Sequence, residues 1–124
     1  MILVDTSIWI NHFRGAGPLA EMLDKNVVQT HPFVIGELAC GHLPNRPSTL
    51  QLLSELPSVR VAADQEALYF IEQHSLMARG AGYIDVHLLA SAALSACKLF
   101  TRDKRLQSLA DGLGLAYYYA HQDR

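Results

Sequence analysis

Apolar residues along this chain fall into short continuous runs, separated by longer stretches with helical spacing. Residues 1–4 form one such run and lead into Asp5, which is typical of a strand buried on both faces of a parallel sheet. Further short segments predict strands at residues 27–29, 58–62, 98–101 and 115–119. The strands are therefore expected to be short and to lie at the centre of the fold.

The stretches between these segments carry helix start and stop signals. Caps, first-turn prolines and terminal glycines predict helices over residues 8–15, 32–41, 48–56, 64–80, 84–96 and 103–110, with another that opens at Pro18. Leu68, Ile71 and Leu76 stand at core-type positions. Short strands that alternate with helices predict an α/β fold with a mainly parallel, roughly five-stranded sheet. Ligands of such sheets bind beyond the carboxyl ends of the strands.

Composition sets a few limits on this interpretation. The chain has 124 residues, 50% of them apolar, and is expected to fold as a single domain over residues 1–124. No apolar run is long enough to cross a bilayer, and residues 1–5 do not resemble a signal peptide, so we expect a cytoplasmic protein with no membrane contact. The net charge of −2 is unusual for a nucleic-acid binder, although residues 79–105 carry five basic residues against two acidic ones.

Four carboxylates are expected near the carboxyl edge of the sheet. Asp5 directly follows the first strand, and Asp103 follows the strand at residues 98–101. Asp85 lies in the first turn of its helix, where backbone N–H groups and the helix dipole favour an anion. Glu37 borders an apolar helix stripe, where a carboxylate without a partner is uncommon. Each residue alone also fits a plain structural role, as a helix cap or a surface ion pair.

Convergence of these carboxylates is unfavourable without a counter-charge. At roughly 5 Å and an effective dielectric near 20, two ionised carboxylates repel by about 3 kcal/mol. Such a site takes up protons or holds a divalent cation, and oxygen-only donors favour Mg²⁺ or Mn²⁺. A hard cation in an acidic cleft suits phosphodiester hydrolysis by activated water. The nearby hydroxyls of Ser7 and Thr101 fit two roles equally, orienting a water or carboxylate and plain capping or packing.

Four segments occur in an order that resembles a known family. They are Val-Asp-Thr-Ser at residues 4–7, Gly-Glu-Leu-Ala-Cys-Gly at 36–41, Gly-Tyr-Ile-Asp-Val-His-Leu-Leu-Ala at 82–90 and Thr-Arg-Asp at 101–103. Together they resemble the PIN-domain ribonucleases, above all the VapC toxins of bacterial type II toxin–antitoxin pairs. The resemblance implies a three-layer α/β/α fold and a Mg²⁺-dependent endoribonuclease, with Mn²⁺ as a substitute. It also implies a homodimer and a VapB-type antitoxin whose C-terminal segment fills the active-site groove.

The resemblance also assigns roles by position. The residues that match the catalytic acids and metal ligands of the family are Asp5, Glu37, Asp85 and Asp103. Asp5 and Asp85 match the principal ligands, and Ser7 and Thr101 match accessory hydroxyls. His87 stands where many members have a small apolar residue, and we interpret it as structural. Contacts with the RNA backbone are expected from Arg79, Arg102, Lys104 and Arg105.

Two alternative functions stay open at this point. A receiver-like binding module also has a phosphorylatable Asp with acidic neighbours, although the paired acids and late lysine usual in such modules are not evident here. A catalytically inactive PIN-type binding module is the other alternative function.

Two explanations also fit the excess of apolar residues in the second and fourth helices, core packing and a groove for an antitoxin helix. These residues are Leu19, Met22, Leu23, Leu52, Leu53 and Leu56.

Overall fold

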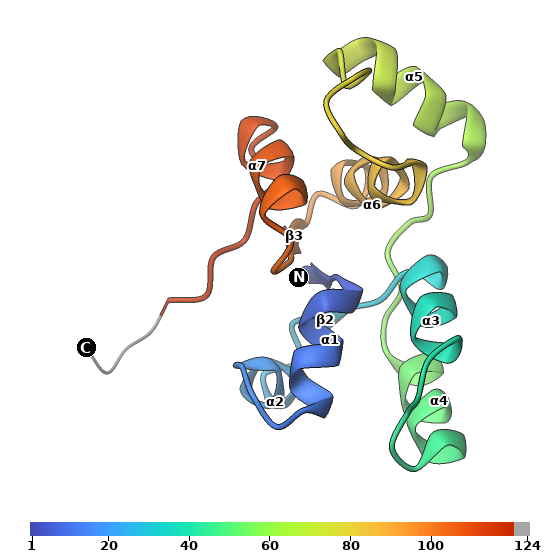
Figure 1. Ribbon diagram of the computed structural model, residues 1–124, viewed down its shortest axis with the longest axis vertical. Helices are drawn as coiled ribbons and strands as arrows, with labels where there is room; N and C mark the ends of the chain where they lie inside the picture. Colours follow the sequence, from blue (N-terminus) through green and yellow to red (C-terminus); the bar gives the residue numbers. More distant parts are fainter. Residues whose placement is uncertain (121–124) are drawn as a thin grey trace.

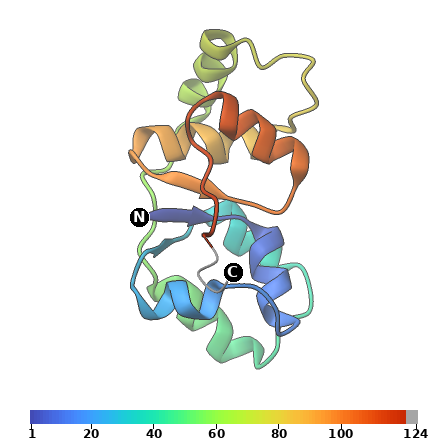
Figure 2. The ribbon, with the colours of Figure 1, turned by 90° about the vertical axis from the view of Figure 1, so that its left-hand side faces the viewer.

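The computed structural model describes residues 1–120, which form helical layers on the two faces of a small sheet. The strands are β1 (Ile2–Val4), β2 (Val28–Gln29) and β3 (Lys98–Phe100). The helices are α1 (Thr6–Phe13), α2 (Leu19–Asp24), α3 (Pro32–Ala39), α4 (Arg46–Glu55), α5 (Asp64–His74), α6 (Tyr83–Leu94) and α7 (Lys104–Gly112). Helices α5 to α7 lie on one side of the strands and α1 to α4 on the other (Figure 1, Figure 2). The predicted three-layer α/β architecture is confirmed.

Strand β1 is the centre of the sheet and pairs in parallel with β2 on one side and β3 on the other. Leu3 lies opposite Leu99, and both are buried because helices cover both faces of the sheet. The backbone N–H of Asp5 donates to the carbonyl of Phe100 at 2.9 Å, so pairing continues one residue beyond β1. The carboxyl ends of β1 and β3 therefore lie side by side.

The expected number of about five strands is wrong, since residues 1–120 contain three. In place of a strand at residues 58–62, Ser58 makes a single bridge to Thr30. Beyond Val59, the N–H groups of Arg60 and Ala62 donate instead to the hydroxyls of Ser95 and Ser91, at 2.8 Å and 2.9 Å. These donors are therefore not available to a neighbouring strand, and the segment crosses beneath α6 without extending the sheet.

The strand predicted at residues 115–119 is also reduced to one bridge, between Leu99 and Ala116. Two backbone hydrogen bonds of Leu99 hold the segment there. Thr101, the next residue that would face the segment in a longer β3, has already left the strand. The short length of β3 thus limits its pairing with residues 115–119, because backbone groups beyond the end of a strand are not placed to form further inter-strand hydrogen bonds.

Helix α5 is shorter than its hydrophobic pattern predicts. It ends at His74 because Ser75 adopts a left-handed conformation with φ of 53°, and the chain does not continue as helix to residue 80. Leu76 is buried as predicted, although it lies beyond the end of the helix. Leu68 was also predicted in the core, but it is exposed on the outer face of α5.

The apolar residues of α2 and α4 are mostly part of the core. Leu19, Met22 and Leu53 are fully buried, so core packing rather than a groove explains these three, whereas Leu52 remains 49% exposed. Within residues 1–120, no helix is both long and apolar enough to cross a membrane.

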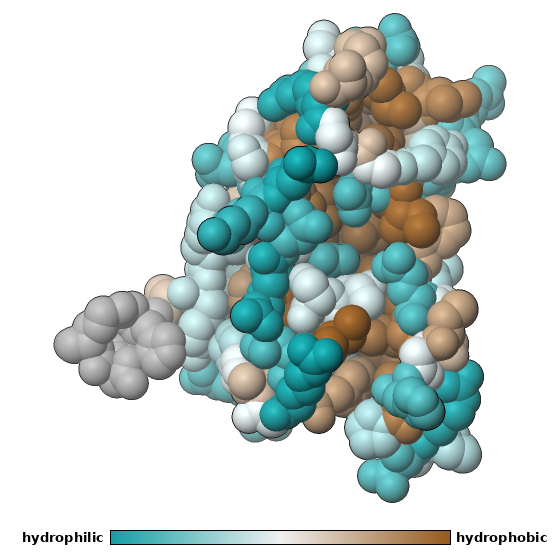
Figure 3. All heavy atoms as spheres, in the orientation of Figure 1, coloured by the Kyte–Doolittle hydropathy of each residue, from teal (hydrophilic) through white to brown (hydrophobic). Residues whose placement is uncertain are grey.

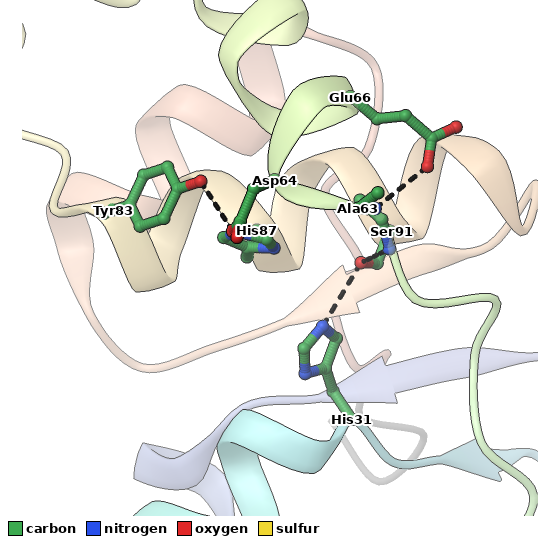
Figure 4. Close-up of polar contacts among 8 residues, drawn as sticks. His31, Ala63, Asp64, Glu66, Tyr83, His87 and Ser91 are labelled. Atoms are coloured by element: carbon green, nitrogen blue, oxygen red, sulfur yellow. Dashed lines mark hydrogen bonds and ion pairs between the residues drawn. The ribbon is translucent and has the colours of Figure 1, made fainter.

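A buried histidine joins the two helical layers. His31 caps α3, because its Nδ1 accepts the backbone N–H of Phe33 at 2.9 Å. Since Nδ1 accepts, the ring proton lies on Nε2, which donates to Ser91 Oγ on α6 at 3.2 Å (Figure 4). The same Oγ accepts the N–H of Ala62. One neutral imidazole thus holds α3, α6 and the segment before α5 together.

We expect the protein to lose stability in mild acid because of His31. Burial, with a smaller contribution from His87, lowers the pKa of His31 from 6.5 to about 4. The unfolded chain therefore binds this proton first, and the free energy of unfolding should fall by about 3 kcal/mol between pH 7 and pH 4. Chemical denaturation across this pH range measures the loss.

His31→Asn provides the matched control for this prediction. Asparagine retains an acceptor for the Phe33 N–H but does not titrate. The variant should show a shallower pH dependence than the parent between pH 7 and pH 4. An equal pH dependence of the free energy of unfolding in both proteins would show that His31 does not cause the loss of stability.

Candidate active site

Asp5 occupies the centre of the candidate site, at the carboxyl end of β1. Its Oδ2 accepts hydrogen bonds from Thr101 Oγ1 at 2.7 Å and from Ser7 Oγ at 3.0 Å. Both hydroxyls are themselves held by the backbone, because the N–H of Arg102 donates to Ser7 and the N–H of Asp103 donates to Thr101. Asp5 is only 8% exposed, so these donors offset the cost of burying its charge. The network fixes the orientation of this carboxylate.

The carboxylates of Glu37 and Asp103 are exposed and approach from two other elements. Glu37 lies on α3, and its Oε1 accepts a hydrogen bond from Thr6 Oγ1 on α1 at 2.8 Å. Asp103 is the N-cap of α7, where its Oδ1 accepts the N–H of Leu106 at 3.0 Å. Asp103 therefore caps α7, as one of its two interpretations predicted. The cap uses Oδ1 and leaves Oδ2 without a capping hydrogen bond.

Asp85 lies in the first turn of α6 and is half-buried. Burial raises the pKa of this carboxyl, and the negative charges of Asp5, Asp103 and Glu37 raise it further. A hydrogen bond from the N–H of Gly82, 3.4 Å from Oδ2, opposes the rise. The other three acids thus all act on Asp85, so the fold brings the four predicted site residues into one electrostatic group.

The four carboxylates share one region without forming a closed set of metal ligands. Within residues 1–120, no three Asp, Glu, His or Cys side chains lie close enough together to hold a metal ion. Each of the four accepts a hydrogen bond from the protein: Asp5 from two hydroxyls, Glu37 from Thr6, and Asp85 and Asp103 from backbone N–H groups. The chemistry of the donor set, oxygen with no nitrogen or sulfur, fits a hard divalent cation. The orientation of the side chains does not yet complete a coordination shell.

The four predicted basic contacts are exposed beside this acidic group. Arg102 and Lys104 flank Asp103 in sequence, and hydrophilic side chains gather over α7 (Figure 3). The side chain of Arg105 lies against Gly80, where an added Cβ would stand 2.7 Å from Arg105 Cδ. Gly80 also has φ of +82°, so both its conformation and this close approach favour glycine. The contact joins α7 to the loop that precedes α6.

Two residues near the site illustrate what sequence reasoning resolved and missed. His87 is 2% exposed and turns toward α5, where its Nε2 lies 3.0 Å from Asp64 Oδ1, so a structural interpretation fits its position. Thr6 was missed as the partner of Glu37. Its position next to Asp5 is the only signal in the sequence, because Thr6 and Glu37 lie 31 positions apart in the chain.

A family model described as PIN domain matches residues 2–112 of the chain. The chain belongs to the PIN-domain family. Two relatives named Ribonuclease VapC32, from Mycobacterium tuberculosis strains CDC 1551 / Oshkosh and ATCC 25618 / H37Rv, are each 42% identical over 118 residues. These matches cover 94% of this chain and 95% of each relative. The resemblance to VapC-type PIN proteins is thereby confirmed, and a receiver-like module is excluded.

A solved structure supports the same fold at greater distance. The crystal structure of PAE2754 from Pyrobaculum aerophilum aligns with a TM-score of 0.57 and 19% sequence identity. The alignment covers 86% of this PIN-domain chain and 82% of the other. At this level of identity the likeness concerns the fold alone.

A groove of this PIN domain runs from the acidic group along α1 and the segment after α3. Its lining includes Ile10, Phe13, Arg14, Glu37, Leu43 and Pro44. Glu37 belongs both to the groove and to the acidic group. An occupant of the groove would therefore meet Glu37 of the acidic group together with apolar side chains.

We expect Thr101→Val to destabilise the protein by about 1–3 kcal/mol. The substitution keeps the size of the side chain but removes the donor to Asp5 and the acceptor for the Asp103 N–H, both in a buried position. Denaturant unfolding at neutral pH measures the change. Thr101→Ser is the control, because it retains the hydroxyl, and it should recover most of the loss. Equal destabilisation by both variants would contradict the prediction, because the hydroxyl that Thr101→Ser retains would then have recovered none of the loss.

Proposed function

We propose that this chain is the endoribonuclease toxin of a VapBC-type toxin–antitoxin pair, and that it hydrolyses RNA phosphodiester bonds with a divalent cation, Mg²⁺ or Mn²⁺. The observation that carries the proposal is the electrostatic group of four carboxylates, drawn from β1, α3, α6 and the cap of α7. Like charges gathered in this way are costly unless a cation compensates them. The names of the relatives, which describe them as ribonucleases, support the same activity.

The residues divide into ligands, supports and phosphate contacts. Asp5 and Asp85 would hold the cation, and Glu37 and Asp103 would act on it directly or through water. A divalent cation bound there would supply Lewis-acid polarisation of the scissile phosphate and a lowered pKa for attacking water. The hydroxyl of Thr101, together with that of Ser7, keeps Oδ2 of Asp5 engaged and so holds the second oxygen in one orientation.

The basic rim has a separate role in the proposal. The side chains of Arg102, Lys104 and Arg105 on the α7 side, together with Arg79, would neutralise RNA phosphates on either side of the cut. Since the protein carries a net charge of −2, this local surface rather than the overall charge would attract the substrate.

One observation favours a second candidate, an inactive PIN-type binding module. The acids do not converge into a ligand set within the described part of the chain. An inactive module would bind RNA or a partner without cutting, whereas the four acids retained together favour the nuclease. Cleavage assays separate the two candidates.

Purified protein should cut structured RNA in the presence of Mg²⁺ or Mn²⁺, and EDTA should stop the reaction. Asp5→Asn and Asp85→Asn should each lower the rate about a hundredfold or more, because each removes a negative charge that would hold the cation. Gel analysis of labelled RNA fragments measures the rate. Asp24→Asn, at an exposed acid on α2, is the charge-matched control and should cut like the parent. Full activity of Asp5→Asn would remove the site assignment, and a parent that binds RNA without cutting it would favour the inactive module.

The antitoxin partner is proposed from the groove beside Glu37. Its apolar walls and its contact with the acidic group suit a peptide segment with apolar side chains and a basic residue that reaches the acids. Such a segment would block RNA by occupying the same end of the sheet. The homodimer remains a prediction from the family resemblance, and the cytoplasmic location remains a prediction from the sequence pattern.

Expression of the chain in a bacterial host without a partner should arrest growth. The arrest should depend on catalysis, so Asp5→Asn protein produced at the same level should permit normal growth. Co-expression of a small protein encoded beside this gene should relieve the arrest. Growth curves with immunoblots for protein level measure both effects. Unimpaired growth with abundant folded parent protein would contradict the toxin role.

A further inference from the structure

One hydroxyl holds the most mobile type of side chain in the acidic group. Glu37 is exposed on α3, and a glutamate there has many rotamers open to it. The hydroxyl of Thr6 donates to Glu37 Oε1 at 2.8 Å, and within residues 1–120 this is the one hydrogen bond that the Glu37 side chain makes. No ion pair reaches Glu37 from the same part of the chain. The orientation of this carboxylate therefore depends on Thr6.

The position of Thr6 in the chain links Glu37 to the buried acid of the site. Asp5 is the N-cap of α1, and Thr6 and Ser7 are the first two residues of that helix. Consecutive residues of a helix point about 100° apart. Ser7 accordingly donates back to Asp5, whereas Thr6 reaches across to Glu37 on α3. One short segment thus sets the positions of two acids relative to each other.

The four acids follow a common pattern of hydrogen bonding. In each carboxylate one oxygen is held by a donor of the protein, and the second oxygen accepts no hydrogen bond from the described part of the chain. In Glu37 the held oxygen is Oε1 and the second is Oε2. A carboxylate held in this way keeps one oxygen for a cation or for a water bound to it.

A hydroxyl orients Glu37 without neutralising its charge. An arginine or lysine in the place of Thr6 would also hold the carboxylate, but its positive charge would weaken the attraction of the acidic group for a cation. The hydroxyl carries no charge and donates one hydrogen. Thr6 therefore limits the rotamers of Glu37 and leaves the full negative charge in the site.

We propose that Thr6 is a positioning residue, which holds Glu37 in the orientation in which Oε2 acts on the divalent cation, directly or through water. The inference rests on the proposed function and adds a residue to the machinery of that site. Thr6 acts only through Glu37, so its removal should weaken cation binding and leave the fold intact.

Thr6→Val tests the inference, because valine has nearly the shape of threonine but cannot donate a hydrogen bond. The probe is Mn²⁺ alone, and its binding to the RNA-free protein is measured by electron paramagnetic resonance of the unbound ion. The dissociation constant should rise about tenfold, which is typical when a metal ligand loses the partner that orients it. Thr6→Ser retains the hydroxyl and should bind Mn²⁺ like the parent.

Two controls separate positioning from a general structural effect. The bond between Thr6 and Glu37 is exposed to solvent, so its loss should change the Tm little. Thr49→Val on α4 is the matched variant, because it removes a hydroxyl that is also half-buried but that donates to the backbone carbonyl of Pro44 rather than to an acid. This variant should retain the Mn²⁺ affinity of the parent.

A double variant shows whether Thr6 acts through Glu37. Mn²⁺ binding should be weaker in Glu37→Ala than in the parent, and Thr6→Val should weaken it no further in that background, so the two effects should not add. Cleavage gives a second readout. At limiting Mn²⁺ the Thr6→Val protein should cut RNA more slowly than the parent, and saturating Mn²⁺ should restore the rate.

The outcomes distinguish this inference from the proposed function. The inference would be overturned by an unchanged or tighter Mn²⁺ affinity in Thr6→Val, by an equal loss in Thr6→Ser, or by a parent that binds no Mn²⁺. RNA cleavage by the parent in any of these cases would leave the ribonuclease proposal standing. Mn²⁺ binding that depends on the Thr6 hydroxyl, in a parent that never cuts RNA, would support the role of Thr6 and remove the nuclease.

Discussion

The buried carboxylate of Asp5 is the constraint from which the rest of the site follows. A charge at 8% exposure needs donors, and the chain supplies two hydroxyls, from Ser7 and Thr101. Hydrogen bonds to a charged group contribute about 1.5–3 kcal/mol each, so this network stabilises the fold as well as the site. Because the hydroxyls are held by the backbone of residues 102 and 103, the two strand ends cannot separate without releasing the charge.

Helix α6 contributes to the acidic group on one side and to the packing of the fold on another. Asp85 faces the acidic group from its first turn, while His87 and Ser91 contact α5 and the junction at His31. The buried contacts of the later turns hold the helix in place, and they allow the first turn to be exposed and charged. A loop with positive φ at Ala78 and Gly80 leads into that turn, where Arg105 packs against it.

Separation of charge organises the surface around the site. Acidic side chains lie at the strand ends, basic ones over α7, and aromatic rings on the α3 and α6 side. In the proposed function, the acidic side chains would hold the cation at the scissile phosphate and the basic side chains would contact the flanking phosphates. The proposed contacts with RNA depend on this local distribution of charge, since the net charge of the chain is −2.

The sequence by itself determined the layered α/β fold, the short buried strands and the identity of the four acids. These features depend on local patterns: an apolar run that ends at Asp5, helix caps, and an Asp in the first turn of α6. Only the tertiary structure decided how many strands pair, because Ser91 takes a backbone donor that a strand would need. It also decided the partners of each acid, since contacts between distant segments leave no periodic trace in the chain.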